Sequence, residues 1–212
     1  VGFLNSHKPD IVVTHSSTDS WLVALARLFV KTPFHIVRVR HVSATVHPTI
    51  ATRWLYQQAS LVVTTSSAIK SHLIESLNLN HDEVIVVSTG IDVHKVSGLS
   101  AVASRVPIKR RLGVADGPLV LGMLSTLRSW KGHRFALEAL TKLDDTILVI
   151  AGDGPQEESL KSLVKTLSLQ QRVIFLGYQD NPYEILQVLD VFLQPSYANE
   201  GLSQSLMQAM SV

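Results

Sequence analysis

The chain has 212 residues, of which 46% are hydrophobic and 17% are charged, a globular composition that excludes an intrinsically disordered protein. The formal net charge is +2, and the scattered Lys and Arg residues form no stripe with aromatic residues, which disfavours nucleic-acid binding. The absence of cysteine excludes disulfides, thiolate metal sites and cysteine nucleophiles. The longest apolar run, 21–30, has about ten residues including Arg27, too few to cross a bilayer.

Short runs rich in Val, Ile and Leu alternate with longer amphipathic segments along the chain. Several runs are apolar on both faces, which is typical of parallel strands covered on both sides. This alternation predicts an α/β fold with parallel sheets. The predicted strands are 10–15, 34–41, 61–66, 84–89, 119–125, 146–152, 172–177 and 191–196. The predicted helices are 19–30, 48–59, 67–78, 132–143, 155–168, 182–189 and 201–211.

The alternation breaks once, between Asp92 and about Pro118, where Gly, Ser and Pro indicate a connection with one short helix near 107–112. Because four strands lie on each side, we expect two Rossmann-like lobes, 1–92 and 93–212, joined near residues 90–92. The chain opens on loop-like residues and stops inside a helical pattern. We therefore expect a fragment of a longer protein, with both lobes incomplete.

Polar residues gather where the predicted strands end, which is where open α/β sheets bind their ligands. Helix caps and loops explain some of them, such as Ser16, Ser67 and Asp153. Caps do not explain the cluster of basic residues that follows the fifth strand. The polar stretches at the strand ends are 15–17, 40–41, 65–67, 125–133, 152–155, 177–181 and 196–201.

The stretch "STLRSWKGH" (125–133) consists of a strand end, a turn with Arg128 and Lys131, and a helix start near Gly132. A helix N-terminus presents free N–H groups and a partial positive charge, which two cations would oppose. A bound anion would resolve this conflict, and a diphosphate is the natural candidate. Two solvated basic residues on a loop are the alternative, and spacing alone leaves both interpretations open.

Two further motifs are weaker when taken alone. "GDGP" (152–155) lacks the spacing of a dinucleotide fingerprint, so a tight turn is the favoured interpretation. In "NEGLSQSLMQAM" (199–210), Gly201 permits close approach of a ligand, and Glu200 suits either a helix cap or a ligand contact. Gln208 shares a face with Gln204 and is either solvated or ligand-binding. The predicted core stripe of this helix is Leu202, Leu206, Ala209 and Met210.

In their order and spacing, these motifs resemble the retaining glycosyltransferases of family 4, which have the two-lobed GT-B architecture. The C-terminal lobe matches the family pattern with "RSWKG", "AGDGP", "IFLG" and "EGLSQSLMQA". "STGID" (88–92) is similar to the family's hinge sequence, and "RVRHVSA" (38–44) matches the segment with a histidine beside the donor sugar. The resemblance covers nearly the whole chain.

The resemblance implies a nucleotide-diphosphate sugar donor, with UDP or GDP expected, and neither a cofactor nor a metal. Arg128 and Lys131 would hold the diphosphate, Glu200 would contact the donor sugar, and His41 would lie beside the transferred sugar. The backbone near Gly177–Tyr178 would meet the base, and Gln208 occupies the position that usually binds the ribose hydroxyls. The donor-binding residues implied in this way are Ser125, Gly154, Tyr178, Gly201, Leu202 and Gln208.

The implied activity is hexosyl transfer with retention to a glycan or lipid-linked acceptor in polysaccharide biosynthesis. The implied place is the cytoplasm, with peripheral association at the inner face of the membrane allowed. No carboxylate pair for double displacement is visible, which disfavours a glycosidase. An epimerase or phosphorylase of the same fold, or a non-catalytic nucleotide-sugar-binding subunit, are the alternatives. Because family elements expected before Val1 and after Val212 are missing, we expect little activity from this fragment.

Overall fold

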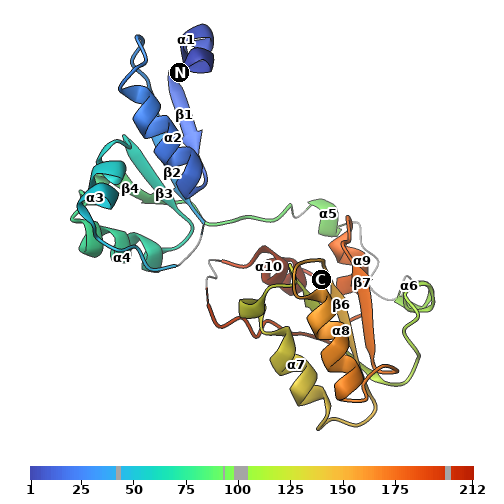
Figure 1. Ribbon diagram of the computed structural model, residues 1–212. Helices are drawn as coiled ribbons and strands as arrows, with labels where there is room; N and C mark the ends of the chain where they lie inside the picture. Colours follow the sequence, from blue (N-terminus) through green and yellow to red (C-terminus); the bar gives the residue numbers. More distant parts are fainter. Residues whose placement is uncertain (42–43, 93, 98–104, 199–201) are drawn as a thin grey trace. The chain divides into compact units, whose positions relative to one another are not determined.

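The computed structural model describes residues 1–41, 44–92, 94–97, 105–198 and 202–212. Two compact units form, one from Val1–Thr89 and the other from Gly90–Ala198 with Ser203–Val212. Each unit contains one parallel sheet of four strands flanked by helices (Figure 1). The predicted α/β fold class with two parallel sheets is therefore confirmed. Within the described ranges, no helix combines the length and apolar character that crossing a membrane requires.

The first unit has its strands in the sheet order β1-β2-β3-β4, all parallel. Its core is formed by side chains such as Tyr56, Leu73 and Val84. The strands are β1 (Ile11–Thr14), β2 (His35–Arg40), β3 (Leu61–Thr64) and β4 (Val84–Val86). The helices are α1 (Gly2–His7), α2 (Ser17–Arg27), α3 (Ile50–Gln57), α4 (Ser67–Leu77) and the 3-10 turn η1 (His81–Glu83).

The second unit has the sheet order β7-β6-β5-β8. Its strands are β5 (Leu119–Leu124), β6 (Thr146–Ala151), β7 (Val173–Gly177) and β8 (Val191–Phe192). Its helices are α5 (His94–Ser97), α6 (Arg105–Arg111), η2 (Ser129–Lys131, a 3-10 turn), α7 (His133–Leu140), α8 (Glu157–Thr166), α9 (Pro182–Leu186) and α10 (Gln204–Met210).

The central strands of the second unit are buried on both faces, as their continuous apolar runs predict. In β6, Leu148 and Ile150 join a core cluster with α7 and α8, whereas Ile147 and Val149 join a second cluster with α9. Alternate residues of one strand therefore serve two cores. This double cover leaves only the strand ends free to carry polar groups.

Two glycines bring the loops at these strand ends together. At Gly152, where φ is +132°, an added Cβ would lie 2.1 Å from the carbonyl oxygen of Ser125. At Gly132, where φ is +77°, it would lie 2.2 Å from the carbonyl oxygen of Pro195. L-residues rarely adopt such conformations, and no side chain fits these gaps. The glycines therefore fix the loops after β6 and β8 against the loop after β5.

The last helix differs from its prediction. It begins at Gln204 instead of 201, because the Ser203 hydroxyl caps it by accepting a hydrogen bond from the backbone N–H of Leu206 at 3.4 Å. The predicted core stripe is wrong, since Leu202 and Leu206 are exposed and Met210 is 81% exposed. Only Ala209 packs against the core. Since α10 packs mainly against α9, only one side of α10 faces the interior.

Two local expectations at helix starts are also wrong. Residues Gly2–His7 form α1 where loop-like residues were expected. Pro155 precedes α8, which begins at Glu157, so the proline lies before the helix instead of in its first turn.

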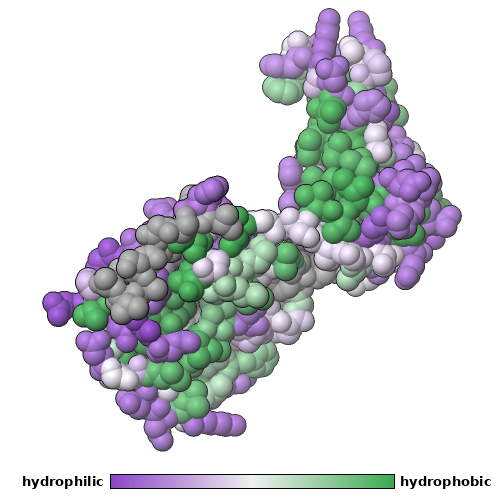
Figure 2. Space-filling model, turned by 180° about the vertical axis from the view of Figure 1, so that it is seen from behind, coloured by the Kyte–Doolittle hydropathy of each residue, from purple (hydrophilic) through white to green (hydrophobic). Residues whose placement is uncertain are grey.

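Apolar side chains are exposed on the first unit, where Figure 2 shows hydrophobic residues gathered on one face. About half or more of the surface of Ile11 and Val13 in β1 is exposed, and the same holds for Leu22 and Leu25 of α2. Phe29, in the turn after α2, is also exposed. Among the described residues, nothing covers these side chains. Because β1 is an edge strand of its sheet, this region combines apolar side chains with unpaired strand backbone.

Candidate functional site

The loops after β5, β6 and β7 lie side by side at the carboxyl edge of the second sheet. The backbone N–H of Ser125 donates to the carbonyl oxygen of Ala151 at 3.0 Å, and that of Gly152 donates to Gly177 at 2.7 Å. The stretches "STLRSWKGH", "GDGP" and "GYQDN" therefore begin from adjacent positions. This is the edge at which parallel α/β sheets bind their ligands.

Arg128 directly precedes the η2 turn and Lys131 ends it, just before α7, as the motif predicts. The Arg128 guanidinium is exposed and lies over the Trp130 ring, with 5.3 Å between the guanidinium carbon and the ring centroid. Lys131 is half-buried. Within the described part of the chain, no side chain caps the N-terminus of α7. Two cations and an uncapped helix start thus occur together, an arrangement that suits an anion.

The segment after β8 packs against this turn. The backbone N–H of Tyr197 donates to the carbonyl oxygen of Trp130 at 3.0 Å, and the Tyr197 ring meets Phe135 edge-on at 5.8 Å. Arg128, Phe135 and Tyr197 line a hollow of about 280 Å³ beside α8. The structure therefore brings the "RSWKG" motif next to the segment that leads to Glu200.

His133 is a residue that the sequence placed near the two cations but did not assign to the site. It is the first residue of α7, is 2% exposed, and its Nε2 lies 3.2 Å from the hydroxyl of Ser125. Its buried Nδ1 has no hydrogen-bond partner among the described residues. Burial, aided by the positive charge of Lys131, lowers the pKa of His133 to about 4. The imidazole is therefore neutral at pH 7.

Gly154 has a packing reason for being glycine. With φ at +151°, an added Cβ would lie 2.7 Å from the carbonyl oxygen of Leu127. Leu127 in turn donates its N–H to Asp153 at 2.7 Å and accepts one from Gln156 at 3.0 Å. These bonds hold the "GDGP" loop against the loop after β5. The donor-binding role of Gly154 stays a prediction.

Tyr178 and Gln208, predicted from two separate motifs, line one pocket of about 560 Å³. Tyr178 follows β7 and is 71% exposed, whereas Gln208 lies on α10 and is half-buried. Gln204 lines the same pocket, as its shared helix face with Gln208 predicts. Two carboxylates, Asp92 and Asp180, also line it, and the sequence analysis assigned neither to the site.

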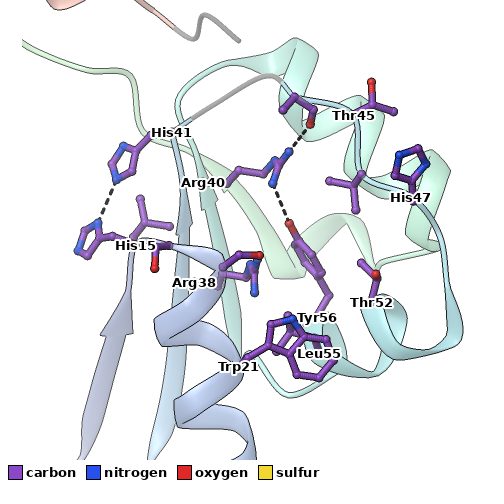
Figure 3. Close-up of a pocket in the computed structure, with 15 residues that line it drawn as sticks. His15, Trp21, Arg38, Arg40, His41, Thr45, His47, Thr52, Leu55 and Tyr56 are labelled. Atoms are coloured by element: carbon purple, nitrogen blue, oxygen red, sulfur yellow. Dashed lines mark hydrogen bonds between the residues drawn. The ribbon is translucent and has the colours of Figure 1, made fainter. Parts of the chain in front are cut away.

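His41 belongs to the first unit, directly after β2. Its Nε2 lies 3.0 Å from Nδ1 of His15, and the two rings stack with centroids 5.3 Å apart (Figure 3). Both histidines line a pocket of about 580 Å³ with Arg38, Arg40 and Tyr56. The sequence indicated His15, Arg40 and His41 by their place at strand ends.

Four predicted residues remain, and the structure describes two of them. Glu200 and Gly201 lie outside the described residues, so their roles stay predictions. Leu202 is exposed and precedes α10. Ser125 lies at the end of β5, where its hydroxyl meets His133.

Two successive parallel α/β units, with polar loops at the carboxyl edge of the sheet, are the architecture of the two-lobed GT-B class. The family model "Glycosyl transferases group 1" matches residues 104–212, and the model "Glycosyltransferase Family 4" matches residues 2–95. Because the first match covers half of the chain, the chain belongs to the group 1 glycosyl transferases. It is a glycosyltransferase of the family 4, GT-B type.

Relatives and solved structures agree with this membership. The O-antigen biosynthesis glycosyltransferase WclY of Escherichia coli is 31% identical over 101 residues, 48% of this chain and 28% of that protein. The UDP-Gal:alpha-D-GlcNAc-diphosphoundecaprenol alpha-1,3-galactosyltransferase of Escherichia coli is 26% identical over 98% of this chain and 57% of its own length.

The crystal structure of HepE from Anabaena in complex with UDP shares the fold, with a TM-score of 0.80 and 23% identity. That similarity covers 97% of this chain and 58% of HepE. This chain thus spans between 28% and 58% of the length of these three proteins.

Proposed function

We propose that the chain carries the core of a retaining, hexosyl-type glycosyltransferase that uses a nucleoside diphosphate sugar as donor. The observation that carries this proposal is the pocket shared by Tyr178 and Gln208. An exposed tyrosine offers a face on which a base stacks. A carboxamide offers one acceptor and two donors, which suit the two hydroxyls of a ribose.

In this proposal the diphosphate binds beside the uncapped start of α7, next to Arg128 and Lys131. The bond between the anomeric carbon and the diphosphate oxygen breaks, a new bond forms to an acceptor hydroxyl oxygen, and the hydroxyl proton passes to an oxygen of the departing diphosphate. Negative charge then grows on the departing nucleoside diphosphate. Two fixed cations stabilise that charge more than they stabilise the bound donor, which accelerates the reaction.

The acceptor in this proposal is a glycan or a lipid-linked sugar, and the reaction needs no cofactor. The name of the galactosyltransferase relative specifies a diphosphoundecaprenol acceptor, which supports the lipid-linked class. The bound UDP of HepE supports the donor class. We assign residues 1–92 to the acceptor side and 93–212 to the donor side. Such an enzyme would work in the cytoplasm at the inner face of the membrane.

Calorimetric titration with UDP and uridine tests the donor site. Removing the tyrosine ring by Tyr178→Ala should weaken both ligands by about tenfold, because both contain the base. The double variant Arg128→Ala, Lys131→Ala should weaken UDP by at least about tenfold and leave uridine within about twofold, because only UDP carries phosphates.

The matched control is Arg110→Ala, Lys165→Ala, which removes two exposed charges of the same unit away from the site. It should leave UDP affinity within about twofold. Equal UDP affinity in the site and control variants would refute the diphosphate assignment. Product analysis of the full-length enzyme with a labelled UDP-sugar then tests transfer, and the anomeric configuration of the product tests retention.

A further inference from the structure

We propose that the first unit contains a second anion site, a pocket for a phosphate or diphosphate group held by Arg38 and Arg40. The pocket has a volume of about 580 Å³ and lies at the carboxyl end of β2 (Figure 3). The assignment of this anion to the acceptor rests on the proposed function. The anion site itself rests on the residues of the first unit alone.

Arg38 is the central observation. It lies two residues before Arg40 on β2, so both side chains project from the same face of the sheet. Arg38 is only 6% exposed, and its Nη1 has no hydrogen-bond partner among the described residues. A buried guanidinium nitrogen without a hydrogen-bond acceptor is costly. A phosphate oxygen in the pocket would supply the missing acceptor.

Tyr56 holds both arginines in place. The Arg38 guanidinium carbon lies 4.3 Å from the centroid of the Tyr56 ring, a cation–π contact that offsets part of the burial cost. Arg40 donates to the Tyr56 hydroxyl at 3.5 Å and also to the carbonyl oxygen of Ala44. The two guanidinium groups are therefore fixed before any ligand arrives, which lowers the entropy lost on binding.

The charge of the pocket is uncompensated. None of the described residues that line it is Asp or Glu. Asp19, a carboxylate near its edge, instead caps α2 by accepting the backbone N–H groups of His15 at 2.9 Å and Ser16 at 2.8 Å. His15 and His41 add further nitrogen atoms to the wall. Two arginines without a facing carboxylate favour an anionic ligand.

Arg27 shows what a structural arginine looks like in the same unit. Its Nη1 donates to the carbonyl oxygen of Gln58 at 2.9 Å, so its buried part is satisfied within the protein. Nη1 of Arg38 has no such bond among the described residues, although the Arg38 side chain lines a pocket of about 580 Å³. A structural role therefore accounts for Arg27, but it does not account for the buried Nη1 of Arg38 that lacks a hydrogen-bond acceptor.

The pocket is larger than one anion. Trp21 and Leu55 contribute apolar wall, and the hydroxyls of Thr45 and Thr52 lie on its lining. Pockets of several hundred Å³ hold small organic ligands. The favoured occupant is therefore a phosphate ester, such as the phosphate end of a lipid-linked acceptor, with its phosphate on the arginines.

Calorimetric titration with inorganic pyrophosphate tests this site. The Arg128→Ala, Lys131→Ala variant is the background, so that the proposed donor site does not contribute. Pyrophosphate should bind this background, and Arg40→Gln should weaken it by at least about tenfold. Arg53→Gln is the matched control, because Arg53 is an exposed residue of α3 outside the pocket. It should leave the affinity within about twofold.

Arg38→Met separates binding from folding. Replacing a buried charge that lacks a partner by an apolar side chain of similar length should leave the melting temperature equal or higher, while pyrophosphate binding is lost. Absence of pyrophosphate binding in the background would overturn the proposal. Equal affinity in Arg40→Gln and Arg53→Gln would overturn it as well.

Competition identifies the source of the anion. A short-chain prenyl phosphate should displace pyrophosphate from the background variant, and UDP should not. Displacement by UDP but not by the prenyl phosphate would overturn the acceptor assignment. A failure of the proposed function is distinguishable from these results, because it would appear as loss of UDP binding by the unsubstituted chain while pyrophosphate binding to the first unit persists.

Discussion

Lowering the pH from 7 to 4 should destabilise the second unit through His133. Burial lowers the pKa of this imidazole from 6.5 to about 4 in the folded chain. Above pH 6.5 the imidazole is neutral in both the folded and the unfolded chain, so protonation of His133 takes nothing from the free energy of unfolding. Between pH 6.5 and about 4 the unfolded chain binds a proton that the folded chain rejects, so the free energy of unfolding falls as pH falls. The difference of about 2.5 pH units corresponds to about 3 kcal/mol.

Hydrogen exchange of the β5 and β6 amides at several urea concentrations measures this loss, since both strands belong to the second unit. His133→Gln has no titrating ring, so it should lose about 3 kcal/mol less than the unsubstituted chain between pH 6.5 and 4. His81→Gln, which removes an exposed histidine, is the control and should follow the unsubstituted chain. Identical pH profiles for the unsubstituted chain and His133→Gln would refute the assignment of this loss to His133.

Five further substitutions have defined outcomes. Gly132→Ala should lower the free energy of unfolding in urea by more than about 3 kcal/mol, because the added methyl would meet a backbone carbonyl at 2.2 Å. Gly113→Ala, at a similar φ but with open space around it, should lower it by about 1 kcal/mol. Equal losses in the two variants would contradict the steric clash at Gly132. Gln208→Glu should keep UDP affinity within about threefold or raise it, and a loss above about tenfold in calorimetry would show an unrecognised contact. Met210→Ser should change stability by less than about 0.5 kcal/mol, and Leu137→Ala should cost about 3 kcal/mol in the same unfolding assay.

The sheets could be predicted from the sequence because short continuous runs of apolar residues indicate strands that are buried on both faces. Leu148, Val149 and Ile150 are each 0% exposed, and only a strand covered on both faces buries three successive side chains in this way. The ligand-binding edge followed from the same reasoning, since the carboxyl ends of parallel strands meet at one edge. Tyr178 and Gln208 therefore share a pocket although 29 positions separate them in the sequence.

The last helix and the first-unit pocket could not be predicted in this way. The apolar spacing of Leu206 and Met210 fits a core stripe, but which side of a helix faces the interior depends on the elements around it. Arg38 lies in the middle of a strand, where a charged residue is usually solvated. Its burial against Tyr56 results from the packing of α3 on the sheet, which no local pattern encodes.

Gln208 is well suited to a pocket that already contains carboxylates. Asp92 and Asp180 line the same cavity, so an acidic residue at 208 would add a third negative charge near a ligand that is itself anionic. Like charges at close range oppose one another, and this repulsion would offset the stronger hydrogen bonds of a carboxylate. A neutral amide keeps its hydrogen bonds to a diol without that repulsion. The glutamine thus fits the proposed donor site, in which neighbouring aspartates would provide the acidic character.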